Sequence, residues 1–141
     1  MNTELFSHIN WLAVLVAGIA YFMLGGLWYS KALFGPKWSA LQKIDMNDPN
    51  MKKGVGAIMF ASFILMLLTS IGLAILVTRM DVVLFSGAIK LGLITGLLFC
   101  VTSVSISFVY EKKPMALHFI TGAYLLVGNI IAAIILVLWR K

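Results

Sequence analysis

Acidic residues and cysteines are scarce in this sequence, and their scarcity excludes several classes of functional site. The 141 residues include five Asp and Glu, three prolines and one cysteine, Cys100. A single cysteine excludes an intrachain disulfide, and no Cys/His cluster has metal-ligand spacing, so we expect no metal site. Paired carboxylates, a Ser/His/Asp set and a phosphate-binding glycine loop in a strand–turn–helix context are also missing. We therefore expect no enzymatic activity and no cofactor.

Apolar residues, in contrast, dominate the chain. They make up 62% of it and charged residues only 11%, whereas soluble domains have about 45–50% and about 25%. This balance predicts that the lipid bilayer is the main partner of the chain. The formal charge is +6, but the basic residues do not form a stripe interleaved with aromatics, so nucleic acid is not an expected partner.

Four apolar runs are long enough to cross a membrane. Crossing the hydrocarbon takes about 20 helical residues, and the runs cover roughly residues 9–29, 55–77, 88–110 and 115–139. No Asp or Glu lies within them, which argues against proton coupling through an intramembrane acid. The sequence predicts an all-α, polytopic membrane protein whose residues 1–141 form a single bundle of four transmembrane helices.

The breaks between the runs predict helix boundaries. Asp48 and Pro49 have the pattern of an N-cap and a first-turn proline, so the second helix is expected to begin there. Asp81 is expected to cap the third helix in the same way. The short link at residues 111–114 predicts that the third and fourth helices are antiparallel neighbours.

The first loop, residues 31–53, is the only long polar segment. Trp38, Leu41 and Ile44 follow one another at a spacing of three. This spacing fits a short helix lying in the membrane interface. An ordinary loop with scattered apolar residues fits equally.

The distribution of basic residues predicts the orientation. The first and third loops share one side and contain seven lysines, whereas the other side has Arg79, Lys90, Arg140 and Lys141. Positive-inside bias places the seven in the cytoplasm, so both termini are expected outside the cell membrane. Lys90 is either snorkelling toward water or buried.

Aromatic residues gather where the first run ends. Trp28 and Tyr29 precede Phe34 and Trp38 within a short segment. They are interpreted either as an interfacial anchor, because amphipathic rings prefer the headgroup level, or as a cap that binds a ligand.

Glycines predict where helices come close together. Gly92 and Gly96 form a GxxxG pattern on one face with Ala88 and Cys100. This face would pack either within the four-helix unit or against a second copy of the chain. Gly25 and Gly26 predict close approach, or a kink, near the end of the first helix.

Polar residues inside the runs are the best pointers to function, because lipid offers them no partners. Asn129 lies near the middle of the fourth run. Its amide would either bond to a neighbouring helix or line a solute pathway. Residues at compatible depths are Thr95, Tyr21 and Tyr124, and Asn10 is expected to face a partner near the outer surface. The hydroxyl row at residues 102–107 could line the same path.

The first quarter of the chain resembles a known family. The matching positions are Asn10, Ala13, Val14, Ala17, Gly25, Trp28, Tyr29, Ser30, Phe34, Gly35 and Trp38, followed more loosely by Gly122, Tyr124 and Trp139. This pattern is similar to the small prokaryotic membrane proteins called domain of unknown function 1761, which also have four predicted spans. Many members have a histidine just after the tyrosine, where this chain has Leu125 and Leu126, so no role of that histidine is transferred. The resemblance implies that Trp28, Tyr29 and Trp38 form a family feature, and it implies no activity.

Two classes of function remain. One is transport of a small solute or ion by a homo-oligomer, because a single bundle of this size has little interior for a pathway. The other is a structural or accessory role without transport. A cavity that reaches Asn129 would favour the first class, and a dry interior would favour the second.

Overall fold

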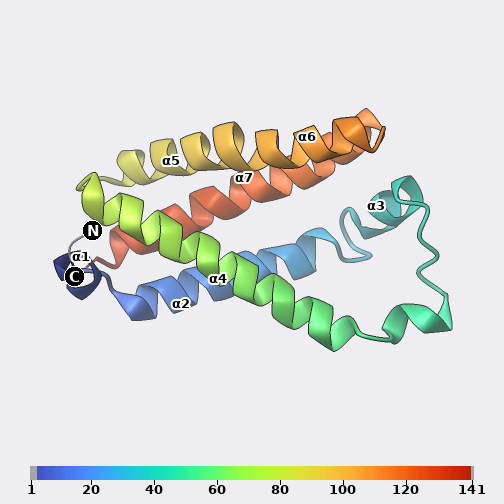
Figure 1. Ribbon diagram of the computed structural model, residues 1–141, viewed down its shortest axis with the longest axis horizontal. Helices are drawn as coiled ribbons and strands as arrows, with labels where there is room; N and C mark the ends of the chain where they lie inside the picture. Colours follow the sequence, from blue (N-terminus) through green and yellow to red (C-terminus); the bar gives the residue numbers. More distant parts are fainter. Residues whose placement is uncertain (1–2, 141) are drawn as a thin grey trace.

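The computed structural model describes residues 3–140, so Lys141, which was counted above for the orientation, lies outside the described residues. The chain forms helices joined by turns and loops (Figure 1). In order, they are α1 (Glu4–Ser7), α2 (Trp11–Trp28), α3 (Gly35–Leu41), the 3₁₀ helix η1 (Pro49–Lys52), α4 (Val55–Arg79), α5 (Phe85–Leu93), the π-helix η2 (Ile94–Val101), α6 (Thr102–Tyr110) and α7 (Met115–Leu138).

Four helices are long and apolar enough to cross a membrane, which confirms the predicted fold class. They are α2, α4, α7 and the continuous helix Phe85–Tyr110 that α5, η2 and α6 form together. Their length and composition indicate a multi-pass membrane protein. Of the two interpretations of the first loop, the structure has the short helix, α3, which ends at Leu41, before Ile44.

The fourth spanning helix, α7, is the central helix of the bundle. It packs against α2, α4, α5, η2 and α6, and small residues such as Gly128, Ala132 and Ala133 are buried on it. Small side chains let neighbouring backbones approach closely, which is how helices associate when lipid supplies no hydrophobic drive. As predicted, α6 and α7 are antiparallel neighbours joined by a tight turn.

The third spanning helix contains an eight-residue π segment, η2. Such segments are rare, and they widen the helix because their hydrogen bonds run from i to i+5. Gly96 is buried within η2 against α7, and the side chain of Cys100 contacts Asn129. The π segment therefore lies where the third span meets the polar centre of the bundle.

Two predicted helix starts differ from the structure. Asp48 caps η1 by accepting a hydrogen bond from the Asn50 amide, and Gly54, with φ of 73°, separates η1 from α4. Hence α4 begins at Val55 and not at Asp48. Asp81 does not cap α5, whose N-cap is Leu84.

Asp81 has another partner. Its carboxylate lies 2.8 Å from a guanidinium nitrogen of Arg140, and the same guanidinium donates to the Val82 carbonyl at 2.9 Å. These contacts hold the turn between α4 and α5 against the end of α7.

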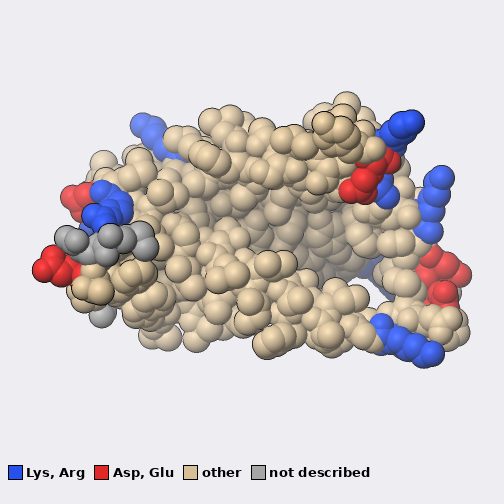
Figure 2. Space-filling model, in the orientation of Figure 1, with Lys and Arg blue, Asp and Glu red and all other residues tan. Residues whose placement is uncertain are grey.

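Charged residues gather at the two ends of the bundle and leave the middle uncharged, as Figure 2 shows. The loop containing α3 and the turn between α6 and α7 lie at one end. Both termini and the turn between α4 and α5 lie at the other. The first and third loops therefore share one end, as the count of spans requires.

Candidate functional site

Asn129 lies buried in the centre of the bundle. Its side chain is 1% exposed, and its amide nitrogen donates to the Leu125 carbonyl at 2.8 Å. The same nitrogen lies 3.3 Å from the hydroxyl oxygen of Tyr21 and 3.4 Å from the sulfur of Cys100. The amide thus joins α7 to α2 and to η2, and Asn129 is not among the residues that line a described pocket.

Tyr21 reaches Asn129 because α7 has a glycine beside it. A Cβ atom added at Gly128 would lie 2.5 Å from two carbon atoms of the Tyr21 ring. The Tyr21 hydroxyl also donates to the Leu125 carbonyl at 3.3 Å. Gly128 therefore makes the space that this ring occupies against α7.

Tyr124 is the centre of a cluster of aromatic rings. Its ring centroid lies 5.5 Å from that of Tyr21, 5.4 Å from that of Tyr29 and 6.4 Å from that of Trp28. Tyr29 in turn contacts Trp38 at 5.5 Å, and Trp28 contacts Phe34 at 4.9 Å. The aromatic cluster, defined by these six rings, connects the end of α2 with α3 and α7.

The Trp28 indole is tied to α7 as well. Its N–H donates to the Ile120 carbonyl at 3.0 Å. A ring that only anchored the helix at the headgroups would direct this donor toward water or lipid. Here the donor is used between helices.

The backbone folds α3 over the end of the bundle at Gly35. The amide of Phe34 donates to the Trp28 carbonyl and that of Gly35 to the Ser30 carbonyl, both at 3.0 Å. A Cβ atom at Gly35 would lie 2.5 Å from the Tyr29 carbonyl oxygen. Only glycine fits this close approach of two backbone segments.

A pocket of about 630 Å³ lies beside the aromatic cluster. Figure 2 shows a hollow in the uncharged middle of the molecule, toward the end that contains α3. Five elements surround the pocket, and α4 diverges from α6 toward its N-terminal end (Figure 1). The lining residues are Phe22, Gly25, Gly26, Tyr29, Trp38, Gln42, Ile58, Met59, Ser62, Met66, Phe108, Thr121 and Tyr124.

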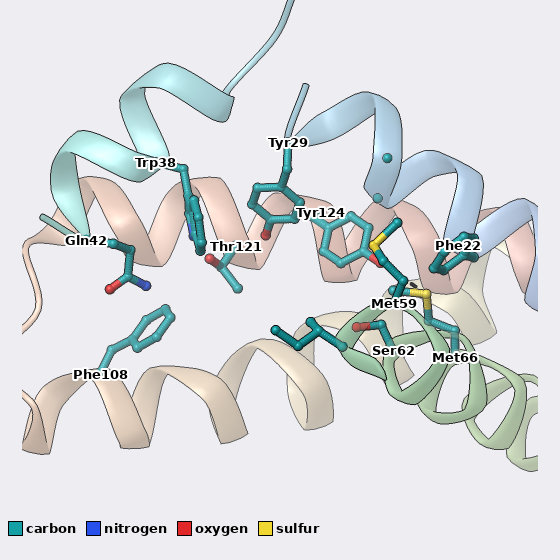
Figure 3. A pocket seen from close by; sticks show the side chains of 13 residues that line it. Phe22, Tyr29, Trp38, Gln42, Met59, Ser62, Met66, Phe108, Thr121 and Tyr124 are labelled. Atoms are coloured by element: carbon teal, nitrogen blue, oxygen red, sulfur yellow. Dashed lines mark hydrogen bonds between the residues drawn. The ribbon is translucent and has the colours of Figure 1, made fainter. Parts of the chain in front are cut away.

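The lining of the pocket suits binding by shape and by hydrogen bonds. Its volume lies within the range of about 300–1,000 Å³ typical of small-molecule sites, which are mostly apolar with a few polar groups. Tyr29, Thr121, Ser62 and Gln42 supply such groups (Figure 3). Within residues 3–140, no carboxylate, histidine or cysteine is among the lining residues, and no three His, Cys, Asp or Glu side chains are placed to hold a metal ion.

The predicted packing glycines have different surroundings. A Cβ at Gly92 would lie 2.5 Å from the Cα of Ile130, and one at Gly96 would lie 3.0 Å from the Cα of Leu126. The GxxxG face is therefore covered by α7 of the same chain. A Cβ at Gly25 would lie 3.0 Å from the Tyr124 hydroxyl, whereas Gly26 has no such atom within 4 Å and does not share the close approach expected of the pair.

Other predicted polar residues do not join this site. Thr95 donates to the Leu91 carbonyl of its own helix at 2.9 Å. Asn10 caps α2, and its amide donates to the Trp139 carbonyl at 2.9 Å, at the opposite end of the bundle. In the hydroxyl row, Ser103 and Ser107 are exposed, so they do not face an interior path within one chain.

Several residues of the site were not predicted from the sequence. Gly128 was missed although it precedes Asn129, and Met59, Met66 and Ser62 were missed because the second span has no distinct polar face. Gln42 and Lys113 were also missed. Two features of the sequence could have pointed to them. Gln42 directly follows Leu41, one of the apolar residues that predicted a short helix, and Lys113 lies in the short link of the third loop, which shares an end of the bundle with the first loop.

The comparisons with known proteins extend the resemblance seen at the start of the chain. No curated protein and no solved structure was found to match. The family model described as Protein of unknown function (DUF1761) matches residues 12–137. The matched segment includes the aromatic cluster, Asn129 and every lining residue of the pocket. This chain therefore belongs to the family of proteins of unknown function DUF1761.

Proposed function

We propose that this protein is a non-enzymatic protein of the cell membrane that binds a small amphipathic solute in the pocket beside Tyr124 and transports it. The observation that carries the proposal is the pocket itself, about 630 Å³ of space bounded by five elements in a small bundle. The aromatic and thioether side chains around it suit an apolar body, and the hydroxyl and amide groups suit a polar end.

The proposed path differs from one that passes Asn129. That side chain is buried and hydrogen-bonded between helices, and opening a path beside it would break these bonds. The pocket lies next to α3 and opens where α4 diverges from α6, so we propose exchange of solute between the pocket and the bilayer or the adjacent water.

The orientation and assembly are further parts of the proposal. Positive-inside bias supports a cytoplasmic location for the end with α3 and an external location for both termini. Self-association is proposed through the face of α4 that points away from the pocket, on which Phe60, Ile64 and Leu68 are 67%, 36% and 57% exposed. We propose no nucleic-acid partner.

Saturable binding tests the proposal most directly. The neutral probe is 4-bromobenzyl alcohol, whose bromine quenches nearby tryptophan, and the signal from Trp38 is the difference between the protein and Trp38→Phe in lipid nanodiscs. We expect saturable quenching that Ser62→Phe abolishes, because the phenyl group fills the pocket. Ser103→Phe, on an exposed serine, is the matched control and should keep it. Equal quenching in both serine variants would refute a binding site in the pocket.

Transport is tested in vesicles loaded with 3-phenylpropionate. We expect faster efflux with the protein than with Ser62→Phe at equal protein content. Binding without any difference in efflux would favour the structural or accessory function, which is also supported by the buried position of Asn129 and the hydrogen bonds of its amide nitrogen.

A further inference from the structure

Polar side chains are more numerous at the end of the pocket beside α3 than at the other end, where the Ser62 hydroxyl lies near Met59 and Met66 (Figure 3). Figure 3 shows Gln42 and the Thr121 and Tyr29 hydroxyl groups toward the side of α3, with Phe22 and Met66 toward the opposite side. A solute that matched this arrangement would place its polar group beside α3 and its apolar part between α2 and α4.

A cation lies directly beside the polar end. The ammonium group of Lys113 donates to the side-chain oxygen of Gln42 at 2.9 Å, and Gln42 lines the pocket. The Lys113 side chain is only 28% exposed, and its carboxylate neighbour, Glu111, is 3.9 Å away and 54% exposed. The ammonium group is thus held partly out of water by an uncharged partner, with a long and exposed ion pair as its only carboxylate contact among residues 3–140.

The amide nitrogen of Gln42 is a second donor at this end. Within the described part of the chain, this nitrogen donates no hydrogen bond, whereas the side-chain oxygen accepts one from Lys113. A negatively charged group between the two side chains would receive a hydrogen bond from each. Hydrogen bonds to an ionised acceptor are roughly twice as strong as neutral ones.

The charge of the surrounding end favours an anion as well. The loops at this end contain seven lysines and three acids, Asp45, Asp48 and Glu111, and these charges gather beyond the hollow in Figure 2. The apolar part of a solute gains little on leaving lipid for an apolar pocket, because lipid tails are equally apolar. Selection among amphipathic solutes therefore depends on the polar end.

We infer that the pocket selects an anionic amphiphile, whose carboxylate or similar anionic group lies between Lys113 and Gln42 and whose apolar part lies against Tyr124 and Met66. The inference rests on the proposed function, because it names the class of solute for the same pocket. Such an anion reaches the pocket either from the bilayer, as a single-chain lipid, or from water, as a short aryl acid.

Competition against 4-bromobenzyl alcohol tests the inference in nanodiscs made of zwitterionic lipid. The competitors are hexadecanoate, hexadecan-1-ol and 3-phenylpropionate, and recovery of Trp38 fluorescence reports displacement. We expect hexadecanoate to displace the probe at about ten-fold lower concentration than the alcohol. Lys113→Met should remove this advantage, and Lys113→Arg should keep most of it.

The neighbouring lysine provides the matched control. Lys112→Met removes the same charge from the same turn, but Lys112 is exposed and it is Lys113 that bonds to Gln42, so hexadecanoate should keep its advantage within about two-fold. A stronger effect of hexadecanoate than of 3-phenylpropionate assigns the bilayer as the source, and the reverse assigns water.

Two failures are distinguishable. In the first, 4-bromobenzyl alcohol binds saturably and Ser62→Phe abolishes this binding, but hexadecanoate and hexadecan-1-ol compete equally and Lys113→Met changes neither. The preference for an anion is then wrong, while the binding site in the pocket stands. If the probe does not bind saturably, the proposed function itself is wrong. If Lys113→Met and Lys112→Met reduced the advantage of hexadecanoate equally, the inference would also be overturned, because the general surface charge would then explain the reduction.

Discussion

Gly128 provides the sharpest test of the packing between α2 and α7. In Gly128→Ala, the new methyl carbon would lie 2.5 Å from the Cε1 and Cζ atoms of Tyr21. Real Cβ atoms essentially never come this close to another heavy atom, so the ring must move away from α7. Its hydroxyl would then leave the Asn129 amide and the Leu125 carbonyl, both now 3.3 Å away.

The expected cost follows from these contacts. Overpacking of a filled site costs about 1–3 kcal/mol, and an interhelical hydrogen bond in a membrane protein contributes about 0.6 kcal/mol. Gly72→Ala is the matched control, because a Cβ at Gly72 in α4 has no such atom within 4 Å. Both variants replace a helical glycine by alanine and gain the same helix propensity, so the difference between them isolates the clash. We expect Gly128→Ala to have a free energy of unfolding about 2–4 kcal/mol lower than Gly72→Ala.

The assay is reversible unfolding by dodecyl sulfate in mixed micelles, followed by circular dichroism. A second substitution, Tyr21→Leu, removes the ring and should make Gly128→Ala much less costly, with a coupling of about 2 kcal/mol in the double-mutant cycle. If Gly128→Ala is as stable as Gly72→Ala, or if Tyr21→Leu leaves its cost unchanged, the placement of Tyr21 against Gly128 is refuted.

Four other substitutions test separate contacts, by the same unfolding assay or by binding of the probe. Asn129→Leu should cost only about 1 kcal/mol and leave saturable binding of 4-bromobenzyl alcohol intact, so loss of binding without loss of stability would place Asn129 in the solute path. Gly35→Ala should disturb the fold-back of α3, because its Cβ would lie 2.5 Å from the Tyr29 carbonyl oxygen; unchanged quenching of Trp38 would contradict this. Arg140→Met should destabilise more than Asp81→Asn, because the guanidinium also donates to a backbone carbonyl, whereas an exposed ion pair alone is worth about 0–1 kcal/mol.

The spanning helices could be predicted from the sequence alone, and the reason is physical. In hydrocarbon every backbone N–H and C=O must be paired, and a single apolar segment can pair all of its own backbone groups only by forming a helix. Composition and length therefore determine α2, α4 and α7 with little help from the rest of the chain. The same holds for the shared end of the first and third loops, which follows from the number of spans.

Helix boundaries near polar residues were less predictable. Asp81 has the chemistry of an N-cap, but its carboxylate contacts Arg140, which is 59 residues later in the sequence. The π segment η2 has no recognisable sequence signal either. Both depend on contacts with a different helix.

The candidate site was predicted in part. Asn129, Tyr21 and Tyr124 were selected because polar groups are costly in lipid, and Trp28 and Tyr29 because amphipathic rings gather at the headgroup level. The structure brings both sets together. Thr95 and Asn10 were selected by the same reasoning, but one bonds to its own helix and the other caps one. Depth in the membrane does not specify the face of the helix on which a residue lies.

The sequence by itself thus determined how many helices cross the membrane and which residues need partners. Only the tertiary structure decided which residues meet, including the space beside Gly128, the cover of Gly92 by α7 and the pocket lined by Gln42 and Met66. The physical reason is that lipid makes all faces of an apolar helix nearly equivalent, so helix rotation and crossing are set by side-chain fit. That fit exists only after the four helices have packed.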